Sequence, residues 1–121
     1  MSSLRSEAEG DVLVIVFNES RILEEAKIRQ VGDELITILN KTDPENVLLD
    51  FRNVNFMSSA MLGTLVRFQK KCKEFKAKLK LCNIDAEILK VFKLTRLDKV
   101  FDIYADADAA RAAFEKRGFF S

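Results

Sequence analysis

The positions of apolar side chains along this chain of 121 residues predict an alternation of strands and helices. Short apolar runs rich in branched side chains predict strands that are buried on both faces. Alternation of leucine with lysine over residues 77–84 predicts a strand with one wetter face, which carries Lys78 and Lys80. The expected strands are residues 4–8, 11–18, 46–51, 77–84 and 100–104, with a hairpin turn at residues 9–11 between the first two.

Apolar spacings of three and four residues predict the helices between these strands. The first helix is expected from residue 24 to about residue 40, and Thr42-Asp43-Pro44 is expected to end it. Its inward face is predicted to hold Ile28, Val31, Leu35 and Ile38. Three more helices are expected over residues 59–75, from Asp85 through Phe92, and from Asp106 or Asp108 through Phe114.

The resulting order of elements, ββαβαβαβα, predicts an α/β fold with a mixed, mostly parallel sheet and helices packed on it. A hydrophobic fraction of 48% with only one proline and four glycines is typical of a chain that builds one core. We therefore expect a single domain over residues 1–121.

Charge and cysteine content exclude several functional classes. A formal net charge of +1 argues against nucleic-acid binding through the field of the whole domain. Cys72 and Cys82 lack a CxxC spacing and the chain has no histidine, so we expect buried thiols and neither a metal site nor a cofactor. The first ten residues lack the apolar core of a signal peptide, and no apolar run is long enough to span a membrane, which predicts a cytoplasmic protein.

Catalytic motifs are missing from the sequence as well. Without histidine the commonest general base is absent, and no GxSxG, P-loop or GxGxxG motif occurs. We therefore predict a binding module and not an enzyme.

Two adjacent serines, Ser58 and Ser59, precede the second predicted helix in the stretch FMSSAMLG, residues 56–63. A serine at this place caps a helix by accepting a hydrogen bond from a free backbone N–H. The residues three positions further on, Met61 and Leu62, are neither Glu nor Gln, so no capping box selects one serine. Capping alone and capping combined with a functional hydroxyl both remain open from the residues.

The segment VLLDFRNVNFMSSAMLGTLVRF resembles the signature of STAS domains, the family that includes anti-sigma factor antagonists. The closing segment ILKVFKLTRLDKVFDIYADADAARAAF is similar to the end of the same family. In that family a motif close to FMDSSGLG carries a serine that a partner, both serine kinase and anti-sigma factor, phosphorylates. The resemblance implies a regulatory module whose partners are such a kinase and a phosphatase, with the chain as a monomer or weak dimer.

Aligned with that motif, Ser59 takes the phosphorylated position and is the phosphorylation candidate, with Ser58 as second choice. Ser58 replaces the family's aspartate, and Ala60 and Met61 replace its next serine and glycine. A turn after the second strand, Gly-Glu-Leu-Asp in the family, is Asn18-Glu19-Ser20-Arg21 here. The resemblance implies a partner-binding surface made of Asn18, Glu19, Ser20, Arg21, Ser58, Ser59, Ala60 and Met61. A STAS scaffold or transport-accessory protein without phosphorylation remains the alternative within the family.

A basic stretch over residues 67–80 suggests an alternative outside that family. It contains Arg67, Lys70, Lys71, Lys73, Lys76, Lys78 and Lys80, with Glu74 as its one acid. Such a density can attract nucleic acid or a membrane surface. The stretch has no Tyr or Trp between its charges, so we favour a solvated helix face followed by the outer side of a strand.

Overall fold

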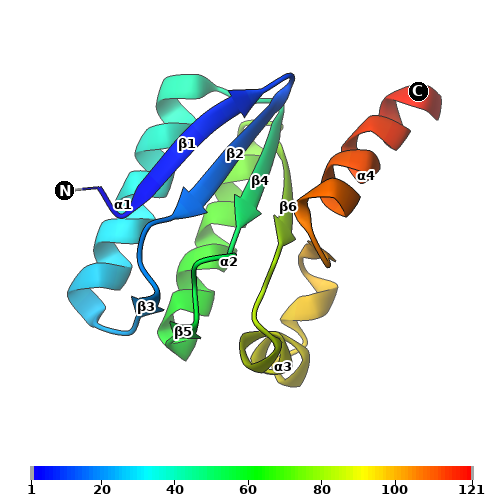
Figure 1. Ribbon diagram of the computed structural model, residues 1–121. Helices are drawn as coiled ribbons and strands as arrows, with labels where there is room; N and C mark the ends of the chain where they lie inside the picture. The colour runs from blue at the N-terminus through cyan, green and yellow to red at the C-terminus, as the bar shows by residue number, and fades with distance from the viewer. Residues whose placement is uncertain (1, 121) are drawn as a thin grey trace.

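A mixed sheet with helices on both faces forms the body of the molecule (Figure 1). The computed structural model describes the backbone of residues 2–120 and the side chains of residues 2–115. The strands are β1 (Leu4–Glu9), β2 (Val12–Phe17), β3 (Arg21–Ile22), β4 (Asn46–Asp50), β5 (Phe56–Met57), β6 (Lys78–Cys82) and β7 (Asp102–Tyr104). The helices are α1 (Glu25–Thr42), α2 (Ser59–Glu74), α3 (Ala86–Leu94), a short 3-10 turn η1 (Leu97–Lys99) and α4 (Ala107–Phe120).

The main sheet has the order β1-β2-β4-β6-β7. β1 runs antiparallel to β2, and every other neighbour in this sheet is parallel. Gly10 makes the hairpin turn between β1 and β2 with φ of +65°, a conformation that favours glycine. The predicted mixed, mostly parallel sheet is confirmed. The two-residue strands β3 and β5 were not predicted, and they pair only with each other.

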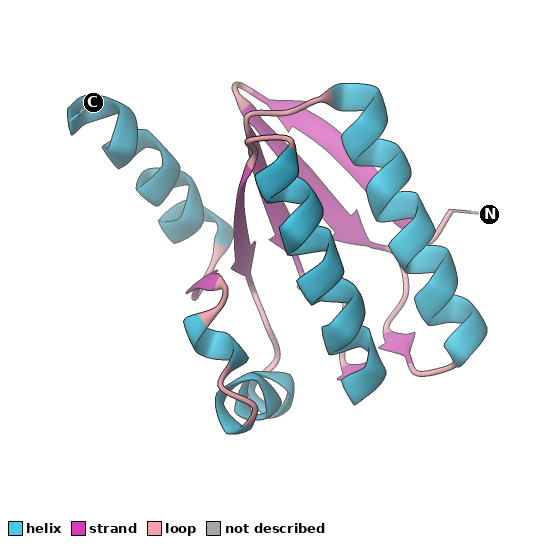
Figure 2. Ribbon diagram, turned by 180° about the vertical axis from the view of Figure 1, so that it is seen from behind, coloured by secondary structure: helices cyan, strands magenta, loops and turns pink. Residues whose placement is uncertain are grey.

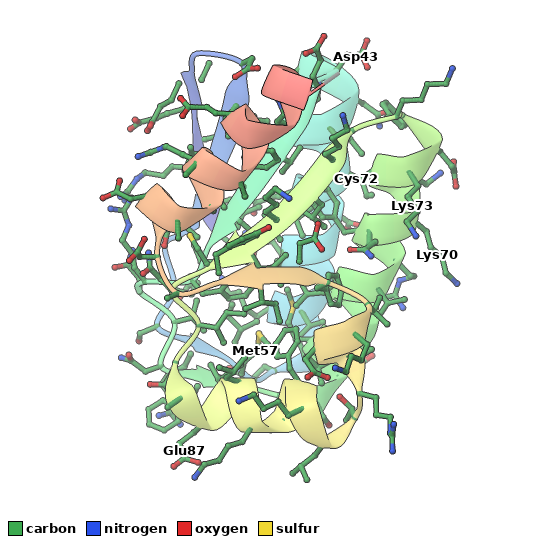
Figure 3. The ribbon with its side chains drawn as sticks, turned by 90° about the vertical axis from the view of Figure 1, so that its right-hand side faces the viewer. Asp43, Met57, Lys70, Cys72, Lys73 and Glu87 are labelled. Atoms are coloured by element: carbon green, nitrogen blue, oxygen red, sulfur yellow. The ribbon has the colours of Figure 1, made fainter. Side chains whose placement is uncertain are left out.

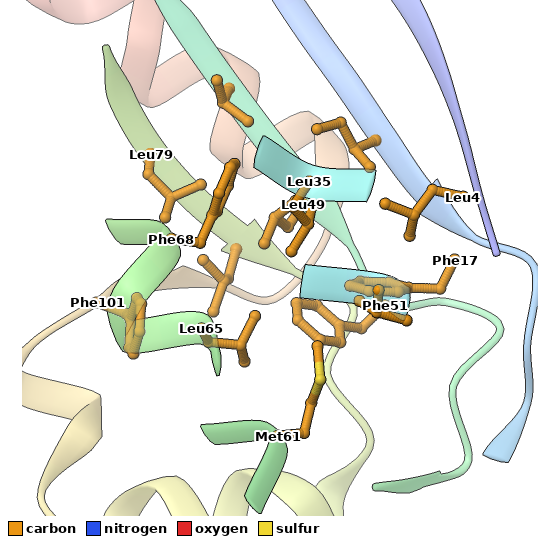
Figure 4. Packing of buried hydrophobic residues seen from close by; sticks show 14 of the residues in the cluster. Leu4, Phe17, Leu35, Leu49, Phe51, Met61, Leu65, Phe68, Leu79 and Phe101 are labelled. Carbon is orange, nitrogen blue, oxygen red and sulfur yellow. The ribbon is translucent and has the colours of Figure 1, made fainter. Parts of the chain in front are cut away.

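The helices divide between the two faces of the sheet. α1 and α2 lie side by side on one face (Figure 2), where their buried side chains and those of α3 join one large hydrophobic cluster. Figure 4 shows Leu35 of α1 and Leu65 and Phe68 of α2 directed into this cluster. α4 covers the opposite face with Ala110 and Phe114, which join a second cluster with valines of β2, Leu48 of β4 and Cys82 at the end of β6. Both faces of the central strands are therefore buried, as their continuous apolar sequences predicted.

In helix α1 the apolar periodicity predicted three of the four buried positions correctly and missed the fourth by one residue. Its buried residues are Ile28, Val31, Leu35 and Leu39. Ile38, predicted to be inward, is only partly buried at the edge of the cluster, because Leu39 occupies the position facing the sheet. The helix ends where predicted: Asp43 adopts a left-handed conformation with φ of +44°, and its N–H donates to the Leu39 carbonyl.

The prediction that β6 has one solvent-exposed face was wrong at Lys80. The alternation placed Lys78 and Lys80 toward solvent, and Lys78 is exposed, but Lys80 is 8% exposed. Its Nζ lies 3.3 Å from Asp102 Oδ2 and 5.0 Å from the ring centroid of Phe114, beneath α4. The sequence pattern of β6 could not reveal this, because the helix that covers this face, α4, begins only at Ala107.

The start of β1 is held against α1 by a carboxylate. Glu34 accepts hydrogen bonds from the backbone N–H of Ser3 at 3.0 Å and of Leu4 at 3.2 Å. In turn the Ser3 carbonyl accepts the N–H of Asn18 at 2.8 Å. These bonds fix the point at which the chain leaves β2 toward the predicted partner-binding turn.

Candidate functional site

The connection from β4 to α2 is anchored by polar side chains at the carboxyl edge of the sheet. Asp50, 2% exposed, accepts the backbone N–H of Arg52 at 2.9 Å and the side-chain amide of Asn83 at 3.0 Å. Asn53 donates to the Phe17 carbonyl at 3.1 Å. Since each buried polar group has a partner, the connection leaves the sheet along a defined path.

Pairing of β3 with β5 brings together two segments of the predicted site, the turn at residues 18–21 and the serine stretch at residues 56–63. The Ser20 carbonyl accepts the N–H groups of Asn55 at 2.8 Å and of Phe56 at 3.1 Å. The N–H of Ser58 then donates to the Ile22 carbonyl at 3.0 Å. The turn at residues 18–21 and the start of α2 therefore lie next to each other, at the same end of the molecule (Figure 1).

The two serines differ in their environment. Ser58 has an extended backbone, with φ of −72° and ψ of 151°, and its Oγ accepts the Ala60 N–H at 3.0 Å. It is the N-cap of α2. Ser59 is the first helical residue and is exposed, and its hydroxyl has no hydrogen-bond partner within residues 2–115. The structure thus separates a capping hydroxyl from a free one.

Met61 does not belong to the accessible surface, which corrects the sequence-based prediction. It is 0% exposed, and Figure 4 shows its side chain pointing from the first turn of α2 into the cluster that contains Phe51. Ala60, next to it, is exposed. A methionine therefore fits where the family motif has glycine, because this position of the helix faces the core.

Most of the 18–21 turn is exposed, which a binding surface requires. Asn18, Ser20 and Arg21 are exposed, and Glu19 is half-buried, with Oε1 3.0 Å from Lys27 Nζ. The Arg21 guanidinium lies over the ring of Phe56, 4.7 Å from its centroid. No pattern in the sequence indicates this contact, because it depends on the β3–β5 pairing.

Comparison with known proteins identifies the family. The model of the STAS domain matches residues 5–110. The chain belongs to the STAS domain family. It is similar to the curated protein named Putative anti-sigma factor antagonist BtrV of Bordetella bronchiseptica, with 26% identity over 94 residues, which cover 78% of this chain and 80% of that protein.

Solved structures resemble this STAS domain, and two of them illustrate the range of similarity. An anti-sigma-factor antagonist (STAS) domain protein from Planctomyces limnophilus superposes with a TM-score of 0.80 and 28% identity, covering 93% of this chain and 98% of that one. The Bacillus cell fate determinant SpoIIAA in its phosphorylated form has a TM-score of 0.62 and 16% identity, covering 91% and 98%. The second likeness concerns the fold alone.

Both thiols of the STAS domain are buried, as predicted. Cys72 lies on the inner face of α2, and burial raises its pKa to about 12. Cys82 ends β6 beneath α4, where burial and then the nearby Asp50 carboxylate raise its pKa to about 12. Within the described side chains, no group of three or more His, Cys, Asp or Glu residues could hold a metal ion. No helix in that part of the chain is long and apolar enough to cross a membrane.

The basic stretch lies toward the other end of α2 from Ser59. Lys70 and Lys73 extend outward from the helix (Figure 3), and Lys71 pairs with Glu74 at 3.4 Å. Of the two aromatic residues among these charges, Phe68 is 2% exposed and faces the core, and Phe75 is partly buried against it. The predicted solvated helix face is confirmed, with the exception of Lys80 on the neighbouring strand.

Proposed function

We propose that this STAS domain is an anti-sigma factor antagonist that binds an anti-sigma factor with serine kinase activity and is switched by phosphorylation of Ser59. The proposal depends on one observation at the start of α2, which is that the two serine hydroxyls differ in their hydrogen bonding. Ser58 supplies the cap, so the exposed Ser59 hydroxyl is left without a structural task. The name of the relative, Putative anti-sigma factor antagonist BtrV, supports the same function.

In this proposal the domain itself needs no catalytic groups. A phosphoacceptor serine needs no base of its own, because the kinase brings nucleotide, metal and base. The acceptor has to be reachable, and Ser59 is exposed at the end of a helix. The domain therefore acts by binding and by presenting one hydroxyl, with no reaction of its own.

Phosphorylation would alter association more than folding. A phosphoserine at the N-terminus of α2 lies at the positive end of the helix dipole, which favours the added charge. In a contact surface the same group introduces about two negative charges that must be desolvated or paired. Binding to the anti-sigma factor is therefore released while the domain stays folded, and a phosphatase restores it.

One observation favours a second function, a STAS scaffold or transport-accessory protein that binds without phosphorylation. The residue before Ser59 is the neutral cap Ser58, where the family motif has an aspartate that a kinase could recognise. The two functions differ in whether a charge at position 59 changes binding.

The test uses the tagged chain purified from cells of the organism that encodes it, with the bound protein identified by mass spectrometry. Incubation of that complex with Mg-ATP should place phosphate on Ser59 and leave Ser59→Ala unmodified. Ser59→Asp should keep the parent's thermal melt and bind the partner more than about tenfold more weakly. If Ser59→Asp binds as tightly as the parent, the switch is excluded and the scaffold function is favoured.

A further inference from the structure

An exposed aromatic ring lies beside the proposed phosphoacceptor. Phe56 in β5 is 53% exposed, and Leu23, directly after β3, is 40% exposed. Because β3 pairs with β5 and the Ser58 N–H donates to the Ile22 carbonyl, the backbone segments that carry these two residues lie together at the start of α2. An apolar patch exposed on a protein surface commonly marks an interaction site.

The ring is held in place before any partner arrives. The Phe56 N–H donates to the Ser20 carbonyl at 3.1 Å, and Phe56 stands opposite Arg21 in the β3–β5 register. The Arg21 guanidinium covers one side of the ring at 4.7 Å from its centroid. A preordered aromatic side chain loses little conformational entropy when it is buried in a contact.

Arg21 brings a charge that has no carboxylate partner of its own. It forms no ion pair within the described side chains, although Glu19 and Glu24 lie within three residues of it. Glu19 is bound instead by Lys27 at 3.0 Å. A guanidinium that stacks on a ring through its face keeps its N–H donors at the edge, where they can bind a carboxylate.

We infer that Phe56, Arg21 and Leu23, here called the Phe56 anchor, dock into an apolar pocket with a carboxylate on its rim, on the surface of the anti-sigma factor. The inference rests on the proposed function for the identity of that partner. Buried aromatic and arginine side chains carry most of the energy of typical protein contacts. The anchor also explains how a kinase can hold this substrate despite the missing aspartate: the docking contact lies beside Ser59 and raises its effective concentration at the active site.

The experiment places the photo-crosslinking residue p-benzoylphenylalanine at position 56, in the full chain expressed in its own organism. The matched control carries it at position 100, because Val100 is 46% exposed and lies beside Gln69 and Lys73 in the C-terminal half of α2. We expect light to produce a covalent adduct from position 56 with the protein that phosphorylates Ser59, and none from position 100.

Affinities measured with that purified protein then test the chemistry of the pocket. Phe56→Ala should weaken binding by at least about tenfold, and Val100→Ala should change it by less than about twofold. Arg21→Met keeps an apolar cover on the ring, so it should fold as the parent does, while binding weakens and depends less on salt concentration. Thermal melts of all three variants separate a loss of docking from a loss of folding.

The outcomes distinguish the anchor from the proposed function. Equal affinity and equal rates of Ser59 phosphorylation in parent and Phe56→Ala would overturn the anchor and leave the function standing. An adduct with a protein that has no kinase activity, together with a tenfold loss in Phe56→Ala, would overturn the function and leave the docking surface standing. No adduct from position 56, or dimerisation of the isolated chain that Phe56→Ala abolishes, would overturn the inferred occupant.

Discussion

Ser58 and Ser59 are neighbours in the chain, but only Ser58 is tied to the helix, through the hydrogen bond that its Oγ accepts from the Ala60 N–H at 3.0 Å. The reason is backbone geometry. Ser58 is extended and lies outside α2, so its side chain can turn back toward the first free N–H groups, whereas Ser59 is already helical. The two hydroxyls should therefore contribute unequally to the stability of the domain.

Removal of the cap should cost stability, and removal of its neighbour should not. We expect Ser58→Ala to lower the free energy of unfolding by about 1 kcal/mol. Ser59→Ala should stay within about 0.5 kcal/mol of the parent, because its hydroxyl is exposed and makes no bond in the described structure. Urea melts of the two variants check this. Ser58→Asp serves as control, since aspartate caps as well as serine does. A larger loss in Ser59→Ala than in Ser58→Ala would mean that the cap is assigned to the wrong residue.

Met61 should behave as a core residue and not as part of a binding surface. Met61→Ala opens a cavity beneath α2 and should cost about 2–5 kcal/mol. Met61→Leu conserves volume and should cost less than about 1.5 kcal/mol. Thermal or urea unfolding gives both values, with Ala60→Ser as an exposed control. A stable Met61→Ala variant that fails to bind its partner would place Met61 on the surface after all.

Glu34 should make the attachment of β1 sensitive to acid. Desolvation by burial acts against its ionisation, but the hydrogen bonds from Ser3, Gln30, Ser2 and Leu4 prevail and lower the pKa of Glu34. Because the folded pKa lies below the unfolded one, the stability it contributes is complete above the unfolded pKa and is lost as the pH falls through the folded pKa.

The free energy of unfolding of the parent should therefore fall between about pH 5 and about pH 3, and Glu34→Gln should fall less over the same interval. Urea melts at both pH values measure the difference. Glu7→Gln, exposed on β1, is the control and should follow the parent. Identical acid sensitivity of Glu34→Gln and the parent would show that this carboxylate does not tie β1 to α1.

The basic stretch should not bind nucleic acid. Of its two aromatic residues Phe68 is buried and Phe75 is half-buried against the core, so bases find little stacking surface, and Lys71 is paired with Glu74. Fluorescence anisotropy with single- and double-stranded oligonucleotides at physiological salt should detect no micromolar affinity. Binding whose salt dependence falls when Lys70 and Lys73 are replaced would revive the class of basic surface binders.

Local patterns were sufficient for the elements that build the main sheet. The buried strands β2 and β4 and the amphipathic helices α1 and α2 follow from the spacing of apolar residues, since that spacing reflects which side faces a core. The end of α1 at Asp43 followed from Thr42-Asp43-Pro44. One error arose where a distant element covers a surface, because Lys80 lies under α4. The other was an error of one residue in the helical period, since Leu39 and not Ile38 faces the sheet.

The sequence by itself determined the α/β order, the family motif and the pair of serines at the start of α2, because each depends on residues close together in the chain. The tertiary structure alone decided which serine is the cap, that Met61 faces inward, and that Arg21 stacks on Phe56. These properties depend on a backbone turn and on the pairing of β3 with β5, which brings together segments 35 residues apart in register. A two-residue strand has too few side chains to show a period, so its partner is selected by hydrogen bonds that form only after the sheet has placed both segments at one edge.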